Sequence, residues 1–162
     1  MDIQIFDSNW EQQLQIIVSV AIATVLGAVV GTERELAARP AGLRTHAILA
    51  AGACLLVGLG DVLLSHFAAS SPPGVLRSDP IRIVEAIVTG TAFLGAGTIF
   101  RHRGNEQVEG LTTAASLLLV AAIGIAVGLR QLLIAIAVTI LTLVLLRVVR
   151  SLFADRKSKA RK

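Results

Sequence analysis

The stretch GLTTAASLLLVAAIGIAVGLRQLLIAIAVTILTLVLL, residues 110–146, contains a single charged side chain, Arg130. A bilayer core about 30 Å thick needs about 20 helical residues to cross it. The apolar runs before and after Arg130 are each long enough, or nearly so, for one crossing. The stretch therefore predicts two membrane helices joined by a very tight turn at Leu129-Arg130.

The rest of the chain continues this pattern. Hydrophobic residues make up 54% of the 162 residues, charged residues only 16%, and the mean hydropathy is +0.76. This composition excludes soluble, disordered and disulfide-framework classes. We predict an all-α polytopic membrane protein with a transmembrane domain over residues 1–150 and a basic cytoplasmic tail over 151–162. Its five transmembrane helices are expected at 13–31, 44–65, 82–100, 111–128 and 131–149.

The distribution of basic residues predicts the orientation. If five helices alternate, twelve Lys and Arg residues lie on one side. Three are in loop 32–43 and at its edge (Arg34, Arg39, Arg44), two are in loop 101–110 (Arg101, Arg103), and seven lie from Arg147 to the C-terminus. The other side carries only Arg77, Arg82 and Arg130. The positive-inside rule therefore places the N-terminus outside and the C-terminus in the cytoplasm. The basic tail is expected to contact anionic lipid rather than nucleic acid.

An internal repeat is visible when the chain is shifted by 68 residues. Leu26-Gly27-Ala28 then aligns with Leu94-Gly95-Ala96, and Gly42-Leu43-Arg44-Thr45 aligns with Gly110-Leu111-Thr112-Thr113. Both copies start outside, which predicts a parallel repeat of helices 1–2 and 3–4 with a fifth helix outside it. At the start of each second helix, Thr45 and Thr113 either cap the helix or help form a shared anion-binding or water-filled vestibule.

Glycines at helical spacing predict close helix packing. Gly27 and Gly31 form one G-x-x-x-G pattern and Gly124 and Gly128 form another. Gly90, Gly95 and Gly97 lie along the third predicted helix. Such spacing lets helices approach closely, either within one bundle or across a homodimer.

The loop after the first predicted helix, TERELAARPAGLR, is dense in charge. Glu33, Arg34, Glu35, Arg39 and Arg44 lie within twelve residues. If the helix continues past Gly31, Glu33 can pair inward with a neighbouring arginine. The segment is interpreted either as a positive-inside loop with local ion pairs or as a gate or partner-docking element, since Arg39-Pro40 fixes its conformation.

Glu85 is the one carboxylate clearly inside a predicted span, and such groups are costly in hydrocarbon. Arg82 precedes it by three residues on the same helical face, and Asp61 is expected at a similar depth. These three residues predict an ion-pair cluster that locks helices two and three, or else a cation entry site.

Enzyme signatures are absent from the sequence. It contains no phosphate-binding G-x-x-x-x-G-K-[ST], no H-E-x-x-H and no Cys/His metal spacing. The Ser, His and Asp candidates are expected at opposite membrane faces. We therefore predict neither catalysis nor a resident cofactor, and Mg²⁺ enters only as a ligand or signal.

The combination of G-x-E-R, R-x-A-G-L-R-T-H, F-L-G-A-G-x-I and G-L-T-T-A-A-S, in this order between Leu26 and Gly128, resembles the MgtC/SapB family of bacterial membrane proteins. The resemblance implies a multi-pass inner-membrane protein. It implies links to growth at low Mg²⁺, to survival inside host phagocytes and to restraint of the rotary ATP synthase. Restraining that enzyme limits ATP and stabilises the membrane potential.

The resemblance also identifies motif positions. They are Gly31, Glu33, Arg34, Pro40, Gly42, Leu43, Arg44, Thr45, Gly95, Gly97, Gly110, Thr112 and Thr113. Some virulence-linked members have asparagine at the position of Thr112. Those members also carry a soluble cytoplasmic domain after the last span, which this chain is expected to lack.

Three functions follow as hypotheses. The first is a regulator that acts through contacts with a membrane partner such as the ATP synthase. The second is a transporter or channel for Mg²⁺ or another ion, for which Glu33, Asp61 and Glu85 are the obvious carboxylates. The third is a homo-oligomeric assembly factor that uses the glycine faces.

Overall fold

The computed structural model describes residues 10–70, 79–101 and 108–159, and the side chains of 10–66, 79–99 and 108–148. These residues form the helices α1 (Trp10–Leu36), α2 (Leu43–Ser70), α3 (Ile81–Ala96), α4 (Leu111–Gly128) and α5 (Leu132–Lys159). Between α3 and α4, the short strands β1 (Phe100–Arg101) and β2 (Val108–Glu109) pair antiparallel. The all-helical class is confirmed.

Three helices among the described residues are long and apolar enough to cross a membrane. They are Trp10–Leu36, Leu43–His66 and Leu111–Gly128. The apolar part of α5, Leu132–Val148, and the 16 residues of α3 are shorter than these three. The chain is thus a membrane protein by length and composition, and the prediction of five crossings is supported for three of them.

Helix boundaries differ from the predicted spans in informative ways. Residues 111–128 agree, whereas α1 continues beyond Gly31 to Leu36 and α5 continues to Lys159, through most of the predicted tail. The prediction that the third helix reaches residue 100 is wrong. After Ala96 the amides of Thr98 and Ile99 donate to the carbonyls of Gly95 and Ala96 in a turn that leads the chain into β1.

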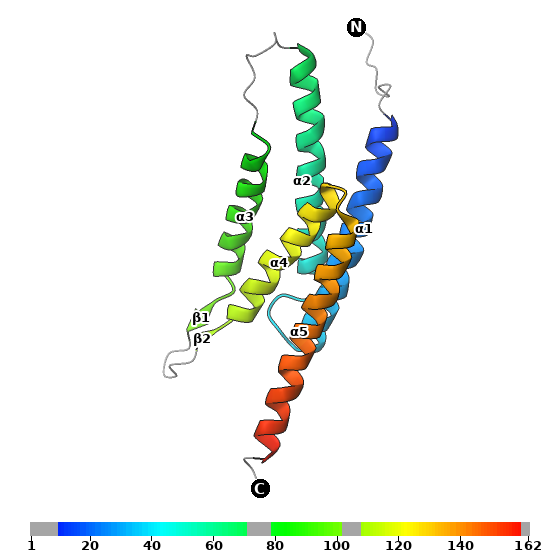
Figure 1. Ribbon diagram of the computed structural model, residues 1–162. Coiled ribbons are helices and arrows are strands. Elements are labelled where there is room, and N and C mark those ends of the chain that lie inside the picture. Colours follow the sequence, from blue (N-terminus) through cyan, green and yellow to red (C-terminus); the bar gives the residue numbers. More distant parts are fainter. Residues whose placement is uncertain (1–9, 71–78, 102–107, 160–162) are drawn as a thin grey trace.

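The helices form one bundle in which α4 contacts all four other helices (Figure 1). Helix α2 packs against α1 and α4, while α3 packs mainly against α4 and α5 packs against α4 and α1. The α1–α2 loop and the β1–β2 pair lie at one end of the bundle, here called the hairpin end. The opposite end, where α1 and α3 begin, is here called the N-terminal end.

Both G-x-x-x-G patterns pack against α2. A Cβ on Gly27 would lie 2.6 Å from the carbonyl oxygen of His46, and one on Gly128 would lie 2.8 Å from the Cβ of Val57. Gly31 and Gly124 similarly touch the backbone of α2. These four glycines therefore serve helix packing within the chain.

Helix α1 ends in a Schellman motif. The Arg39 amide donates to the Arg34 carbonyl, the Ala38 amide donates to the Glu35 carbonyl, and Ala38 takes a left-handed conformation with φ 52°. Glycine is the usual residue at this position because a Cβ is disfavoured there.

Ala38→Gly is expected to stabilise the protein by about 1 kcal/mol, because it removes the steric cost of a left-handed alanine. Thermal unfolding in detergent, followed by circular dichroism, measures the effect. The matched control is Ala37→Gly, one residue earlier and without a positive φ. This variant should not raise the stability of the protein. Equal effects at the two positions would contradict the strain argument.

Candidate functional site

A buried ion pair lies at the hairpin end, near the end of α1. Glu33 and Arg34 are only 5% and 4% exposed. The Arg34 Nε donates to Oε2 of Glu33 at 2.6 Å, and the guanidinium Nη2 contacts the same oxygen. The other carboxylate oxygen, Oε1, is buried without a hydrogen-bond partner. The predicted inward pairing of Glu33 with a neighbouring arginine is confirmed, with one acceptor oxygen left over.

His46 ties α2 to α4 beside this pair. It is fully buried, its Nδ1 donates to the Gly42 carbonyl at 2.9 Å, and its Nε2 lies 3.0 Å from the Ser116 hydroxyl. Ser116 also contacts the Thr113 carbonyl at 2.8 Å. Ser116 has one hydroxyl proton, so it donates either to Nε2 of His46 or to the Thr113 carbonyl. If it donates to the carbonyl, Nε2 of His46 must itself carry a proton in order to bond to the Ser116 oxygen.

Of the Ser, His and Asp candidates that the sequence placed at opposite faces, His46 and Ser116 meet at the hairpin end, whereas Asp61 lies toward the other end. His46 and Ser116 are 70 positions apart, and only the packing of α2 on α4 brings them together. The arrangement differs from a nucleophile triad, since the second imidazole nitrogen faces a backbone carbonyl rather than a carboxylate. The signal in the sequence that could have found this contact is that His46 and Ser116 each follow a G-L-x-T motif closely.

Glu35 begins α2 by capping it. Its Oε2 accepts a hydrogen bond from the Leu43 amide at 2.9 Å and lies close to Gly42. The predicted capping by Thr45 is wrong, because Thr45 is exposed and its hydroxyl accepts no hydrogen bond from a backbone amide in the described chain. A carboxylate reaching back across the loop from α1 satisfies that first turn instead.

The second copy of the G-L-x-T motif adopts a different backbone. Gly110 has φ 92°, and a Cβ there would overlap the carbonyl oxygen of Thr98. No side chain caps α4, so the predicted cap by Thr113 is also wrong, although Thr113 is buried. Gly95 packs near Ala114 of α4, much as Gly31 packs on the start of α2.

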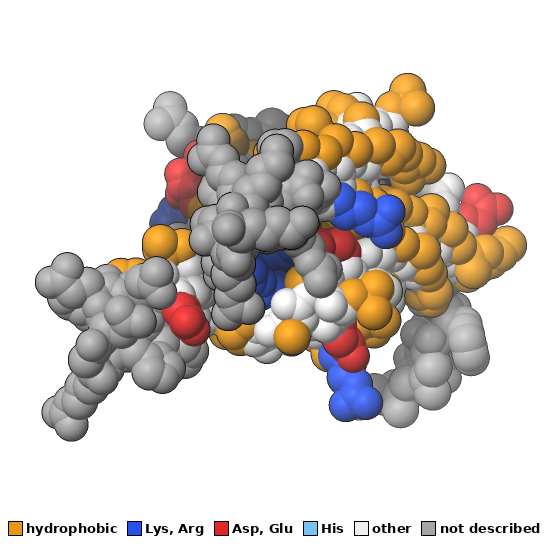
Figure 2. Space-filling model, turned by 90° about the horizontal axis from the view of Figure 1, so that it is seen from below, with side chains coloured by type: hydrophobic (Ala, Val, Ile, Leu, Met, Phe, Trp, Pro, Cys, Tyr) orange, Lys and Arg blue, Asp and Glu red, His pale blue; other side chains and the backbone are white. Residues whose placement is uncertain are grey.

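The motif residues divide into a buried set, an exposed set and the half-buried Gly42 and Gly110. Gly31, Glu33, Arg34, Gly95 and Thr113 are buried. The exposed members at the hairpin end are Arg39, Pro40, Leu43, Arg44, Thr45, Gly97 and Thr112. Seen from this end, acidic and basic side chains lie among hydrophobic ones (Figure 2). This end thus combines a buried ion pair with an exposed surface of mixed charged and hydrophobic side chains.

The predicted ion-pair cluster at the other end does not form. Asp61, Arg82 and Glu85 are all exposed, and the described side chains contain no ion pair among them. Asp61 lines a pocket between α1, α2, α3 and the end of α4, whereas Arg82 and Glu85 lie outside its lining. Within the described ranges, no three His, Cys, Asp or Glu side chains lie close enough to hold a metal ion.

A bundle of apolar helices with a buried polar cluster at one end defines a polytopic membrane protein without a recognisable catalytic constellation in its described part. Residues 20–154 match the MgtC family. The chain therefore belongs to the MgtC family, as the motifs suggested.

Several named relatives are similar over most of this chain. Protein MgtC of Salmonella typhimurium is 42% identical over 127 residues, which cover 78% of this chain and 49% of the relative. Protein SapB of Bacillus subtilis is 36% identical, covering 74% and 50%. "Putative magnesium transporter YhiD" of Escherichia coli K12 is 34% identical, covering 85% and 62%. The chain thus spans about half to three fifths of these relatives, and no solved structure is significantly similar to it.

Proposed function

We propose that this protein is a non-enzymatic protein of the bacterial inner membrane that acts in adaptation to low Mg²⁺ and in ATP and membrane-potential homeostasis. It acts through contact with a membrane partner such as the ATP synthase. The supporting observation is the gathering of the family motifs at the hairpin end, around the buried Glu33–Arg34 pair. The exposed motif residues there, among them Arg39, Arg44 and Thr112, form the contact surface for the partner.

We place the hairpin end in the cytoplasm, with five crossings, the N-terminus outside and the C-terminus inside. The excess of basic residues in the loops and tail on that side supports this orientation. We also propose that helices α1–α2 and α3–α4 form a parallel repeat. The pairwise packing of α1 on α2 and of α3 on α4 supports it, as does the G-L-x-T motif that opens both second helices.

Glu33→Gln is expected to abolish complementation of growth at low Mg²⁺ in a strain lacking its own MgtC-family gene, and to raise cellular ATP to the level of the empty vector. Glu85→Gln, which changes an exposed carboxylate at the other end, should complement fully. Glu33 matters because its charge compensates the buried Arg34 and so holds the end of α1. Membrane levels of both variants, measured by immunoblot, separate lost function from lost protein.

The opposite ranking of the two variants contradicts the proposal. A photo-crosslinking residue at exposed Arg44 should capture the partner, and one at Gln13, near the N-terminal end, should not. If both positions capture the ATP synthase equally, the hairpin end is not the specific contact surface.

A second candidate function, transport of Mg²⁺ or another ion, is favoured by the unpartnered Oε1 of Glu33. Magnesium sites use one or two carboxylates together with retained waters, so this oxygen is a candidate ligand. Proteoliposomes loaded with a Mg²⁺ dye and a potential dye decide between the functions. Regulation predicts no flux above empty vesicles, whereas flux that Glu33→Gln removes would establish transport.

A further inference from the structure

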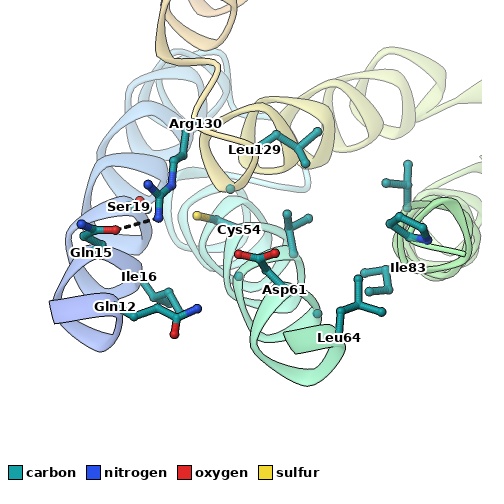
Figure 3. Close-up of a pocket in the computed structure, with 16 residues that line it drawn as sticks. Gln12, Gln15, Ile16, Ser19, Cys54, Asp61, Leu64, Ile83, Leu129 and Arg130 are labelled. Atoms are coloured by element: carbon teal, nitrogen blue, oxygen red, sulfur yellow. Dashed lines mark hydrogen bonds between the residues drawn. The ribbon is translucent and has the colours of Figure 1, made fainter. Parts of the chain in front are cut away.

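A pocket with a volume of about 280 Å³ opens at the N-terminal end, between α1, α2, α3 and the turn that joins α4 to α5. Its α1 side is polar, with the amides of Gln12 and Gln15 and the hydroxyl of Ser19. Asp61 of α2 and Arg130 of the α4–α5 turn also line it (Figure 3). The family motifs at the hairpin end contribute nothing to this pocket.

Two opposite charges share the pocket without pairing. Arg130 Nη2 donates to Oε1 of Gln15 at 2.6 Å, so the guanidinium reaches across to α1 rather than to Asp61. Asp61 forms no ion pair with any described residue. One bond to a neutral amide leaves most of the five donors of Arg130 available. The pocket therefore offers a separated negative and positive group to one ligand.

Arg130 has a left-handed backbone conformation, which is unfavourable for a residue with a side chain. Arg130 has φ 60° and occupies the left-handed position of a Schellman motif, in which Gln131 donates to the Ala126 carbonyl and Arg130 donates to the Val127 carbonyl. Glycine suits this position best. A strained arginine that projects into a pocket is an observation from which a binding role can be inferred.

The depth of the pocket matches the headgroup region. Asp61 follows Leu43 by 18 residues of α2, which corresponds to about 27 Å along the helix axis. A hydrocarbon core is about 30 Å thick, so a helix that enters it near Leu43 brings Asp61 to the opposite interface. The α2 and α3 sides of the pocket carry Leu64, Ile83 and Val84, which are compatible with an acyl chain.

We propose that this pocket binds the headgroup of a phospholipid with a primary ammonium group, as in phosphatidylethanolamine. The ammonium donates to the Asp61 carboxylate and the phosphate accepts from the Arg130 guanidinium. The acyl chains leave along the apolar α2–α3 side. A hydrated divalent cation would use Asp61 alone, would be repelled by Arg130 and would gain nothing from the apolar wall.

The test is native mass spectrometry of the full chain in detergent, titrated with phosphatidylethanolamine, phosphatidylcholine and phosphatidylglycerol of identical acyl chains. We expect phosphatidylethanolamine to bind about tenfold more tightly than phosphatidylcholine, whose quaternary ammonium cannot donate a hydrogen bond. Asp61→Asn should remove this preference. Arg130→Gln should weaken the binding of all three lipids, because all three carry the phosphate.

The matched controls remove one acidic and one basic side chain that lie outside the pocket. Glu85→Gln and Arg82→Gln remove an exposed acid and an exposed arginine from α3, and they should leave lipid binding unchanged. Circular dichroism in the same detergent verifies that each variant is folded, and Asp61→Glu keeps the charge if Asp61→Asn does not fold. Equal binding of the three lipids, or equal losses in the α3 controls, overturns the proposal. Lipid displacement by millimolar Mg²⁺ that depends on Asp61 but not on Arg130 would assign the pocket to the cation instead.

Discussion

Gly124→Ala is expected to lower the free energy of unfolding by about 3 kcal/mol, because the added Cβ overlaps the carbonyl oxygen of Ala50 on α2. A backbone oxygen cannot rotate away as a side chain can, so α4 has to move off α2. Thermal unfolding in detergent, followed by circular dichroism, measures the loss.

Gly52→Ala is the matched control for this change. Gly52 lies on α2, as Ala50 does, and a Cβ there meets nothing within 4 Å. Alanine is the better helix former, so this variant should be neutral or more stable by up to about 1 kcal/mol. A loss at Gly52 as large as that at Gly124 would show that alanine is tolerated poorly for reasons other than helix contact.

Arg34→Leu should destabilise the protein by about 3–5 kcal/mol. The substitution leaves the Glu33 carboxylate buried with neither oxygen bonded, which is the costly way to break a buried ion pair. Removing both charges, in Glu33→Leu with Arg34→Leu, should recover at least half of that loss. The same detergent unfolding assay compares the two.

Arg44→Leu supplies the exposed control for Arg34→Leu. Arg44 follows the same loop and is exposed, so its replacement should change stability by no more than about 0.5 kcal/mol. If Arg34→Leu costs no more than Arg44→Leu, the pair does not stabilise the folded protein. If the double variant is worse than the single one, the packing of the two stems matters more than their charges.

The sequence predicted the helical class, the family and the boundaries of α4, because long apolar runs are a strong local signal. It did not predict β1 and β2, because two-residue strands leave no periodic pattern and Ile99-Phe100 reads as the end of an apolar helix. Helix α3 therefore ends four residues earlier than predicted, at Ala96 rather than at residue 100.

Side-chain partners were harder to predict than helices. The sequence predicted that Glu33 pairs with a neighbouring arginine but did not say which one. Adjacent residues on a helix do not normally face each other, so Arg34 was not the obvious partner. The His46–Ser116 contact depends on how α2 packs on α4. The charges at the N-terminal end were predicted to pair because sequence spacing cannot show that Asp61 faces a pocket rather than α3.

The glycine contacts also limit how the bundle can move. The α2 carbonyls of His46, Ala50 and Cys54, spaced one turn apart, contact Gly27 of α1 and Gly124 and Gly128 of α4. Sliding α2 past either neighbour would require a jump of a full turn, about 6 Å for four residues. Helices α1, α2 and α4 should therefore move as a single rigid body. The helices outside this body are α3 and α5, so a conformational switch in this protein would require one of these two helices to move against it.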